Sequence, residues 1–250
     1  MLNPISALLS LQQLQNLLKD NPQHFNATLP LLLKVLEKKG AQKYLLQLGN
    51  QIVETKSQKP LIVGQNYWAL MQKSSVGAIM LSNLTPQPKI VAQLKNAPLT
   101  LEIKDLPTLL SQEDFKGYKE TLIQHLTHAT TKQDFLLLGN LLLSLQHQVA
   151  SFVIRDNHKE ALLQFKPKKA KQQRLDFYAL YPHLGPLQGS IIFHDPGLEL
   201  YLNVAYESVR TLLQAHQHKL RGFENVHIAT ATNSIEPLFD FEESLLDTRG

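Results

Sequence analysis

The chain has 250 residues, of which 43% are hydrophobic and 18% are charged, as in a folded globular protein and unlike a disordered one. Its formal net charge of +4 favours an acidic partner only weakly. The absence of cysteine excludes a disulfide framework, a thiol nucleophile and a thiolate metal site.

Two helices are predicted at the start of the chain. Asn3 is a good N-cap, Pro4 suits the first turn, and leucines at helical spacing continue to Leu18. This amphipathic start lacks the basic region and compact apolar core of a secretory signal. A second helix is expected over Leu29 to Lys39, where Gly40 can supply a left-handed C-cap.

From Ala41 the pattern changes to short strands. Gly49-Asn50 is a two-residue hairpin signal between two of them. The strands are expected at 44–48, 51–55, 65–72 and 76–84, with two weaker ones at 90–94 and 99–103. Several short strands at close spacing predict a small barrel or sandwich.

A helical segment is predicted after Leu106. Ser111-Gln-Glu-Asp114 and Thr131-Lys-Gln-Asp134 each resemble a capping box, with Asp in place of the usual Glu or Gln. Apolar residues follow each box at helical spacing. We therefore expect two helices, the second ending near Gln148.

The last hundred residues predict a sheet with one helix across it. Strands are expected at 151–155, 161–165, 175–181, 187–194, 198–204 and 226–231. Asp195-Pro196-Gly197 is a clear turn, and a helix with Val209, Leu212 and Leu213 on one face ends before Gly222. The tail 233–250 is acidic and is expected to be mobile or to act as an interaction segment.

No motif indicates catalysis or metal binding. The chain has no Gly-rich phosphate loop and no Gly-x-Ser-x-Gly nucleophile elbow. His125 and His128 share a helix face, whereas His216 and His218 diverge, and neither pair has a third ligand at suitable spacing. We therefore expect no catalytic residue, no cofactor and no metal, and a protein that is not an enzyme.

Two binding hypotheses come from basic and aromatic residues. The dense basic cluster Lys166 to Lys171, with Arg174 beyond it, is explained about as well by a solvated loop as by a docking site. Tyr44, Tyr67 and Trp68 on a barrel-like strand set could stack bases, which leaves a nucleic-acid-binding, OB-like module as an alternative. Aromatic residues on strands are more often core, so no nucleic-acid partner is expected.

Residues 175–231 carry an ordered set of motifs. A strand leads into Tyr181-Pro-His-Leu-Gly185, two further strands follow, and then a helix with Val209-Arg-Thr-Leu-Leu213, Leu220-Arg-Gly-Phe223 and a last strand. This order resembles the C-terminal domain of the flagellar hook-length control protein family, FliK. Pro182, Leu184 and Gly185 match its Pro-Glu-x-Leu-Gly motif without the Glu and one residue shorter, and Arg210 and Arg221 match its helix. The segment from Tyr44 to Gln65 is similar to a small β-module of longer members.

The pattern and the resemblance together predict an α+β fold. We expect N-terminal helices plus a small β-barrel-like module over 1–106 and a helical connector over 107–149. A FliK-C-like domain over 150–232 would be an α/β sandwich with one helix packed on a sheet, and 233–250 would be an acidic tail.

The resemblance implies a flagellar type III export regulator. Such a protein contacts the export gate, an FlhB-like cytoplasmic domain, and switches its substrate specificity. Partner contacts would involve Pro182, Leu184, Gly185, Arg210 and Arg221. The alternative is an interaction or chaperone-like module of the same apparatus without a switching role. A cytoplasmic location without membrane insertion is implied, with export through the flagellar apparatus left open. The predicted folded N-terminal half departs from the long disordered ruler region of the family.

Overall fold

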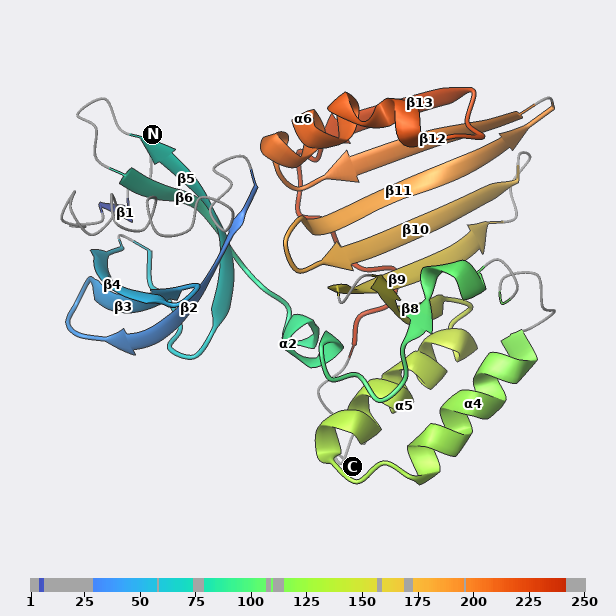
Figure 1. Ribbon diagram of the computed structural model, residues 1–250, viewed down its shortest axis with the longest axis horizontal. Helices are drawn as coiled ribbons and strands as arrows, with labels where there is room; N and C mark the ends of the chain where they lie inside the picture. The colour runs from blue at the N-terminus through green and yellow to red at the C-terminus, as the bar shows by residue number, and fades with distance from the viewer. Residues whose placement is uncertain are drawn as a thin grey trace. The chain divides into compact units, whose positions relative to one another are not determined.

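The computed structural model describes residues 5–6, 29–57, 59–73, 79–106, 109, 115–156, 159–168, 173–195 and 197–241. The chain divides into two compact units (Figure 1). Unit 1 is Met1–Pro88 with His183–Gly185, and unit 2 is Lys89–Pro182 with Pro186–Gly250. The domain limits predicted near 106 and 149 lie inside unit 2.

Unit 1 is an antiparallel sheet in the order β1-β6-β5-β2-β3-β4. Its strands are β1 (Ile5–Ser6), β2 (Leu31–Lys38), β3 (Lys43–Leu48), β4 (Gln51–Lys56), β5 (Asn66–Lys73) and β6 (Ile79–Pro86). β1 pairs with β6 and also lies against β4, so the sheet curls back on itself. The hairpin predicted at Gly49-Asn50 joins β3 to β4, and Gly49 has a positive φ of 59°.

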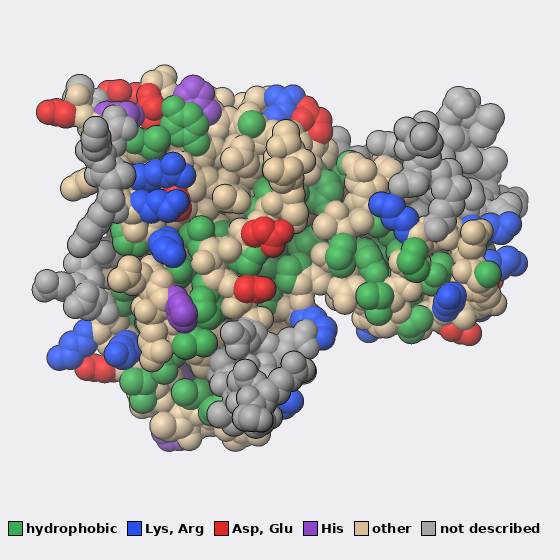
Figure 2. All heavy atoms as spheres, turned by 180° about the vertical axis from the view of Figure 1, so that it is seen from behind, with side chains coloured by type: hydrophobic (Ala, Val, Ile, Leu, Met, Phe, Trp, Pro, Cys, Tyr) green, Lys and Arg blue, Asp and Glu red, His purple; other side chains and the backbone are tan. Residues whose placement is uncertain are grey.

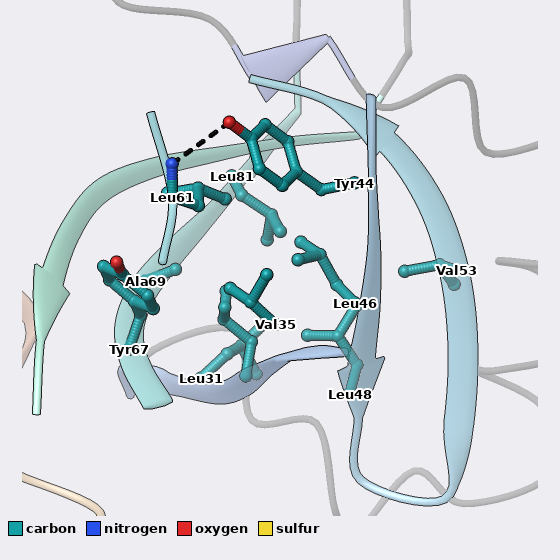
Figure 3. Packing of buried hydrophobic residues seen from close by; sticks show 11 residues of the cluster. Leu31, Val35, Tyr44, Leu46, Leu48, Val53, Leu61, Tyr67, Ala69 and Leu81 are labelled. Atoms are coloured by element: carbon teal, nitrogen blue, oxygen red, sulfur yellow. Dashed lines mark hydrogen bonds between the residues drawn. The ribbon is translucent and has the colours of Figure 1, made fainter. Parts of the chain in front are cut away.

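The core of unit 1 comes from alternate positions of these strands. Tyr44, Leu46 and Leu48 point inward from β3, and Leu31, Leu33 and Val35 point inward from β2. Figure 3 shows these side chains converging with Leu61, Tyr67 and Leu81. Tyr44, Tyr67 and Trp68 are all buried, so they do not form the base-stacking platform of the nucleic-acid alternative.

The helix predicted over Leu29 to Lys39 is wrong, because this segment forms β2. The apolar residues of this segment fit two periods. Alternation as in a strand is met by Leu31, Leu33 and Val35, and the added Leu32 and Leu36 also fit the spacing of a helix. Pairing with β3 on one side and β5 on the other decides between the two periods. The first predicted helix lies outside the described residues except at Ile5–Ser6, which form β1.

Unit 2 contains a larger sheet in the order β13-β12-β11-β10-β9-β8-β7. Its strands are β7 (Leu101–Glu102), β8 (Ala150–Asp156), β9 (Lys159–Lys168), β10 (Arg174–Tyr181), β11 (Gly185–His194), β12 (Gly197–Val204) and β13 (Asn225–Thr230). The segments expected at 151–155, 161–165, 175–181, 187–194, 198–204 and 226–231 are therefore strands. β12 and β13 are parallel, and the chain between them forms α6 (Glu207–Ala215) and the short 3-10 helix η3 (Gln217–Lys219). Figure 1 shows α6 lying over these two strands.

Helices α4 (Lys116–Thr127) and α5 (Lys132–Gln146) pack together, and α5 also packs against β8. The Tyr118 hydroxyl donates to the Ser151 carbonyl at 2.9 Å, and its ring lies 5.0 Å from that of Phe152. The predicted helix start at Thr131 is confirmed, because Thr131 is the N-cap and the Asp134 N–H donates to its Oγ1 at 3.0 Å, while the Asp134 carboxylate accepts from the Thr131 hydroxyl. The box predicted at Ser111–Asp114 lies outside the described residues.

The predicted α+β class is wrong. The structure is mostly β, with two large sheets and few helices, and not a helical N-terminal segment joined to an α/β sandwich. Two errors of secondary structure contribute. β2 was expected to be helical, and the weak strand expected at 90–94 is the helix α2 (Ile90–Leu94). The short β7 and the 3-10 helix η1 (Ile103–Asp105) take the place of the strand expected at 99–103.

Part of the C-terminal tail is attached to the sheet by one buried glutamine. Gln164 Oε1 accepts from the backbone N–H groups of Leu238 and Phe239 at 2.9 and 3.2 Å. Gln164 Nε2 donates to the Phe239 carbonyl at 2.7 Å. The Phe239 ring lies 5.4 Å from that of His147. The tail up to Phe241 is thus held against β9, next to the end of α5.

Candidate partner-binding surface

The strands of unit 2 give its sheet two distinct ends. β10 runs from Arg174 to Tyr181, turns, and continues as β11 from Gly185. β11 turns after His194 into β12, and α6 then returns the chain to the start of β13. We call the end of the strands at which the β10–β11 turn lies the Gly185 end. The opposite end of the strands, where the chain turns into β13, is the Arg221 end.

Three predicted partner residues, Pro182, Leu184 and Gly185, lie at the Gly185 end. Gly185 is buried and has a positive φ of 79°, a conformation that glycine adopts without steric cost. A turn requirement therefore explains this glycine of the motif.

Arg210 is held within a local ion-pair network near the start of α6. Its guanidinium donates to both carboxylate oxygens of Glu207 and, at 2.8 Å, to Gln214 Oε1. Glu207 also accepts from the Thr230 hydroxyl at 2.6 Å, which ties α6 to β13. The hydrogen bonds from Arg210 and then Thr230 lower the pKa of Glu207 to about 2. This arrangement gives Arg210 a structural role in positioning α6.

Arg221 is exposed at the other end of the sheet. The ten residues of β11 separate the two ends, a distance of roughly 30 Å at the usual rise of a strand. The structure therefore does not bring the five predicted residues together into one surface.

A polar cluster that the sequence did not predict occupies the Arg221 half of the sheet. Glu199, on β12, accepts from Asn225 Nδ2 at 3.1 Å and from the Tyr201 hydroxyl at 3.0 Å. His194 Nε2 lies 3.2 Å from the same carboxylate. The hydrogen bonds from Asn225, Tyr201 and His194 lower the pKa of Glu199. A carboxylate that accepts from Asn225 and Tyr201, with the His194 ring beside it, is better suited to holding its neighbours in place than to accepting a proton.

Tyr201 is fixed in place while remaining exposed. Its ring stacks on His227 with the centroids 4.6 Å apart. Its hydroxyl donates to Glu199, and this hydrogen bond raises the pKa of Tyr201. The Tyr201 side chain is therefore presented to solvent in a single orientation.

Lys166, Lys168 and Arg174, the described part of the basic cluster recognised in the sequence, lie on the same face of the sheet as Tyr201. The Phe177 ring lies against the Cα of Gly189, so these two residues share one face, and their neighbours Asp176 and Ser190 point to the other. Ser190 pairs with Tyr201, which places Tyr201 on the Asp176 face.

Asp176 is buried beneath two cationic groups. Lys168 Nζ lies 2.8 Å from one of its oxygens, and Arg174 Nε lies 2.5 Å from the other. Burial alone would raise the pKa of Asp176, but the hydrogen bonds from Lys168 and Arg174 lower it below its usual range. Figure 2 shows Lys and Arg side chains gathered on one face of unit 2. The ion pairs tie part of this basic cluster to the sheet.

Three large apolar residues are exposed in the same half of the sheet as Arg221. Phe193 is the last residue but one of β11 and points to the Gly189 face, Tyr201 lies in β12 on the opposite face, and Leu220 directly precedes Arg221. Part of the polar cluster around Glu199 could have been predicted from the sequence. The turn predicted at Asp195 fixes the β11–β12 register and would have placed His194 near Glu199. The return of α6 to this end could not be inferred from the local pattern.

The part of the chain that the structure describes contains no group of three or more His, Asp or Glu side chains placed to hold a metal ion. Within the same residues, no helix has the length and apolar character needed to cross a membrane. No family model, curated protein or solved structure matches the chain.

Proposed function

We propose that this chain is a protein-binding regulator of flagellar type III export. In this proposal unit 2 contacts the FlhB-like cytoplasmic domain of the export gate and switches its substrate specificity. The observation that carries the proposal is the exposed Leu220 and Arg221 at this end of the sheet, with exposed Phe193 on one face of the sheet and exposed Tyr201 on the other, so that a partner would enclose this end. The motif resemblance to the hook-length control family supplies the choice of partner.

The composition of this surface supports protein binding. Interfaces between proteins are enriched in Tyr, Phe and Arg, and a few such residues contribute most of the binding free energy. Tyr201 is already held by Glu199 and His227, so little side-chain entropy is lost when a partner covers it. Arg221, beside Leu220, can pair with a carboxylate of the partner.

The proposal places the contact at the Arg221 end and gives the other predicted residues structural roles. Gly185 satisfies the backbone of a turn, and Arg210 anchors α6 through Glu207. Substitutions at Gly185 or Arg210 should therefore act on stability, whereas those at Arg221 and Tyr201 should act on binding.

The test is Arg221→Glu in the source organism, scored by hook length in electron micrographs and by swimming. Arg221 is exposed and lies beyond the last turn of α6, so melting should change little. Loss of an interfacial charge pair costs about 2–5 kcal/mol and should give overlong hooks or lost motility. Lys219→Glu, a nearby reversal of charge on η3, is the matched control. Normal hooks and swimming in a folded Arg221→Glu protein would contradict the proposal.

A further inference from the structure

A second exposed apolar feature lies in unit 1, far along the chain from the proposed partner surface. Ile62 is 66% exposed and Val63 is 52% exposed, and they are consecutive residues of the loop between β4 and β5. Exposed apolar residues on soluble proteins are normally scattered singly. Two together at the tip of one loop need a specific explanation.

The loop is held rigidly although its tip faces solvent. Leu61 is buried in the core of unit 1, and its backbone N–H donates to the Tyr44 hydroxyl at 3.3 Å (Figure 3). The next N–H, of Ile62, donates to the Tyr67 hydroxyl at 3.1 Å. Two buried tyrosines therefore fix the backbone that presents the tip.

The other side of the loop is fixed to β2. The Gly64 N–H donates to the Val35 carbonyl at 2.7 Å, and the Val35 N–H donates to the Gln65 carbonyl at 3.0 Å. Gly64 has a positive φ of 84°, which permits the tight turn. With both sides anchored, Ile62 and Val63 cannot fold back into the core, and their exposure is a built feature.

The basic charge of the protein is concentrated in the same unit. Residues 29–88 contain seven Lys and two Glu, with no Asp and no Arg. Residues 89–250, in contrast, contain 17 Lys and Arg against 18 Asp and Glu. The excess of positive charge is therefore a property of unit 1.

Most of these lysines share the end of the sheet from which the tip loop emerges. Lys43 and Lys56 are direct cross-strand partners, and the Lys39 N–H donates to the Lys43 carbonyl at 2.9 Å. Ser57 Oγ donates to the Lys59 carbonyl at 2.6 Å, which ties the start of the loop to the end of β4. Glu54 is shared between Lys39 and Lys43 at 3.5 and 3.6 Å and neutralises only part of this charge.

We propose that unit 1 docks on anionic lipid surfaces, with Ile62 and Val63 entering the bilayer interface and the lysines of the same end of the sheet facing the headgroup phosphates. The proposal is independent of the function proposed for unit 2. An aliphatic tip buried at the boundary between headgroups and acyl chains, combined with nearby basic residues, is the usual physical basis of peripheral binding. Lysines near an anionic membrane are attracted by its diffuse negative potential.

The chemistry of the patch favours a lipid surface over a macromolecular partner. Arginine, which forms the bidentate pairs of protein interfaces, is absent from residues 29–88. Energetically dominant interface residues are enriched in Trp, Tyr and Arg, whereas this tip is Ile and Val. Base stacking with single-stranded nucleic acid requires exposed aromatic rings, and Tyr44, Tyr67 and Trp68 are buried.

The test is flotation of the full-length protein with lipid vesicles. One set is phosphatidylcholine alone, and the other also contains phosphatidylglycerol. We expect binding to the anionic set at low salt, release at high salt, and no binding to the neutral set. The double variant Ile62→Ser with Val63→Ser should bind the anionic vesicles more than about tenfold less, since its aliphatic surface is gone.

Ile52→Ser is the matched control, because Ile52 is 59% exposed on β4 of the same unit but lies near the opposite, Gly49 turn. It should bind as the wild type does. All three proteins should melt alike, since the changed side chains are exposed. Absence of binding to anionic vesicles would overturn the proposal. Equal binding by the double variant would also overturn it, as would capture of a protein through the tip without vesicle binding.

Discussion

At the scale of single residues, Gln164 shows how one side chain can attach a whole segment. It is fully buried, and its amide forms three hydrogen bonds with the backbone of Leu238 and Phe239. Because both amide atoms are used, the segment is held in one register whatever its side chains are. This role could not be predicted from the local pattern, because a Gln between apolar strand positions resembles an outward-facing residue.

Gln164→Leu should lower the free energy of unfolding by about 2–4 kcal/mol. Leucine fills a similar space but leaves partly buried N–H and C=O groups of the tail without their Gln164 partners. Urea unfolding followed by circular dichroism measures the change. Gln188→Leu, an exposed Gln of β11, is the control and should be close to neutral. Equal effects of the two variants would show that the tail contacts do not stabilise the fold.

Asp176 predicts a dependence of stability on pH. Its pKa is lowered in the folded state, because Lys168 and Arg174 outweigh the effect of burial. The ionised carboxylate therefore stabilises the fold above its unfolded pKa of about 4, and this contribution is lost as the pH falls through the folded value. Asp176→Asn should cost about 1 kcal/mol at neutral pH, a modest figure because Lys168 and Arg174 are half-exposed and screened.

The measurement is urea unfolding of wild type and Asp176→Asn at neutral and at acidic pH. The difference should shrink as the pH falls below about 4. Asp105→Asn changes an exposed acid in unit 2 and should show little difference at either pH. A difference that is the same at both pH values would mean that the ion pairs are not its source.

At the scale of elements, local signals predicted the hairpins and helix starts best. Gly49-Asn50, Asp195 and Thr131 each specify their structure through the conformation or hydrogen bonding of a few adjacent residues. The prediction for β2 was wrong for the opposite reason. The leucines of β2 fit both a helical and a strand period, and pairing with β3 and β5 favours the strand.

The cap of α5 gives an element-scale prediction. Thr131→Ala removes the acceptor for the Asp134 N–H and should lower the free energy of unfolding by about 1 kcal/mol. Thr130→Ala, one residue earlier and exposed, should change it much less. Thermal melting of both variants checks the prediction. A larger effect at Thr130 would show that the cap is placed wrongly.

The close approach of β11 to Phe177 and Tyr201 gives a second prediction at the scale of elements. A Cβ added at Gly189 would lie 2.2 Å from the Tyr201 carbonyl oxygen and 2.6 Å from the Phe177 ring. Gly189→Ala should therefore destabilise the protein by about 1–3 kcal/mol through overpacking. Gly40→Ala, where the added atom meets nothing within 4 Å, is the control. If the urea midpoints of Gly189→Ala and Gly40→Ala decrease equally, or if neither decreases, the close packing around Gly189 is contradicted.

At the scale of the whole molecule, the overall composition predicted less than the distribution of charged residues along the chain. The net charge of +4 gave weak information because it averages a basic unit 1 with a nearly neutral unit 2. The strand-rich C-terminal part was largely predictable, whereas the class of the whole fold was not, since β2 was taken for a helix and the size of the second sheet depends on non-local pairing. The partner surface depended on the same long-range order. Arg221 was identified from its motif, but the exposed Phe193 and Tyr201 come from β11 and β12, whose pairing the local pattern does not determine.

The central claim is that the Arg221 end of unit 2 binds the export gate. Calorimetric titration of the full-length protein with the FlhB-like cytoplasmic domain tests it most directly. We expect binding by the wild type and a loss of more than about tenfold in affinity for Tyr201→Ala, an exposed and pre-oriented residue of this surface. Phe135→Ala, which changes an exposed aromatic residue on α5, should bind as the wild type does. Equal affinity of all three proteins, or no binding by the wild type, would contradict the account.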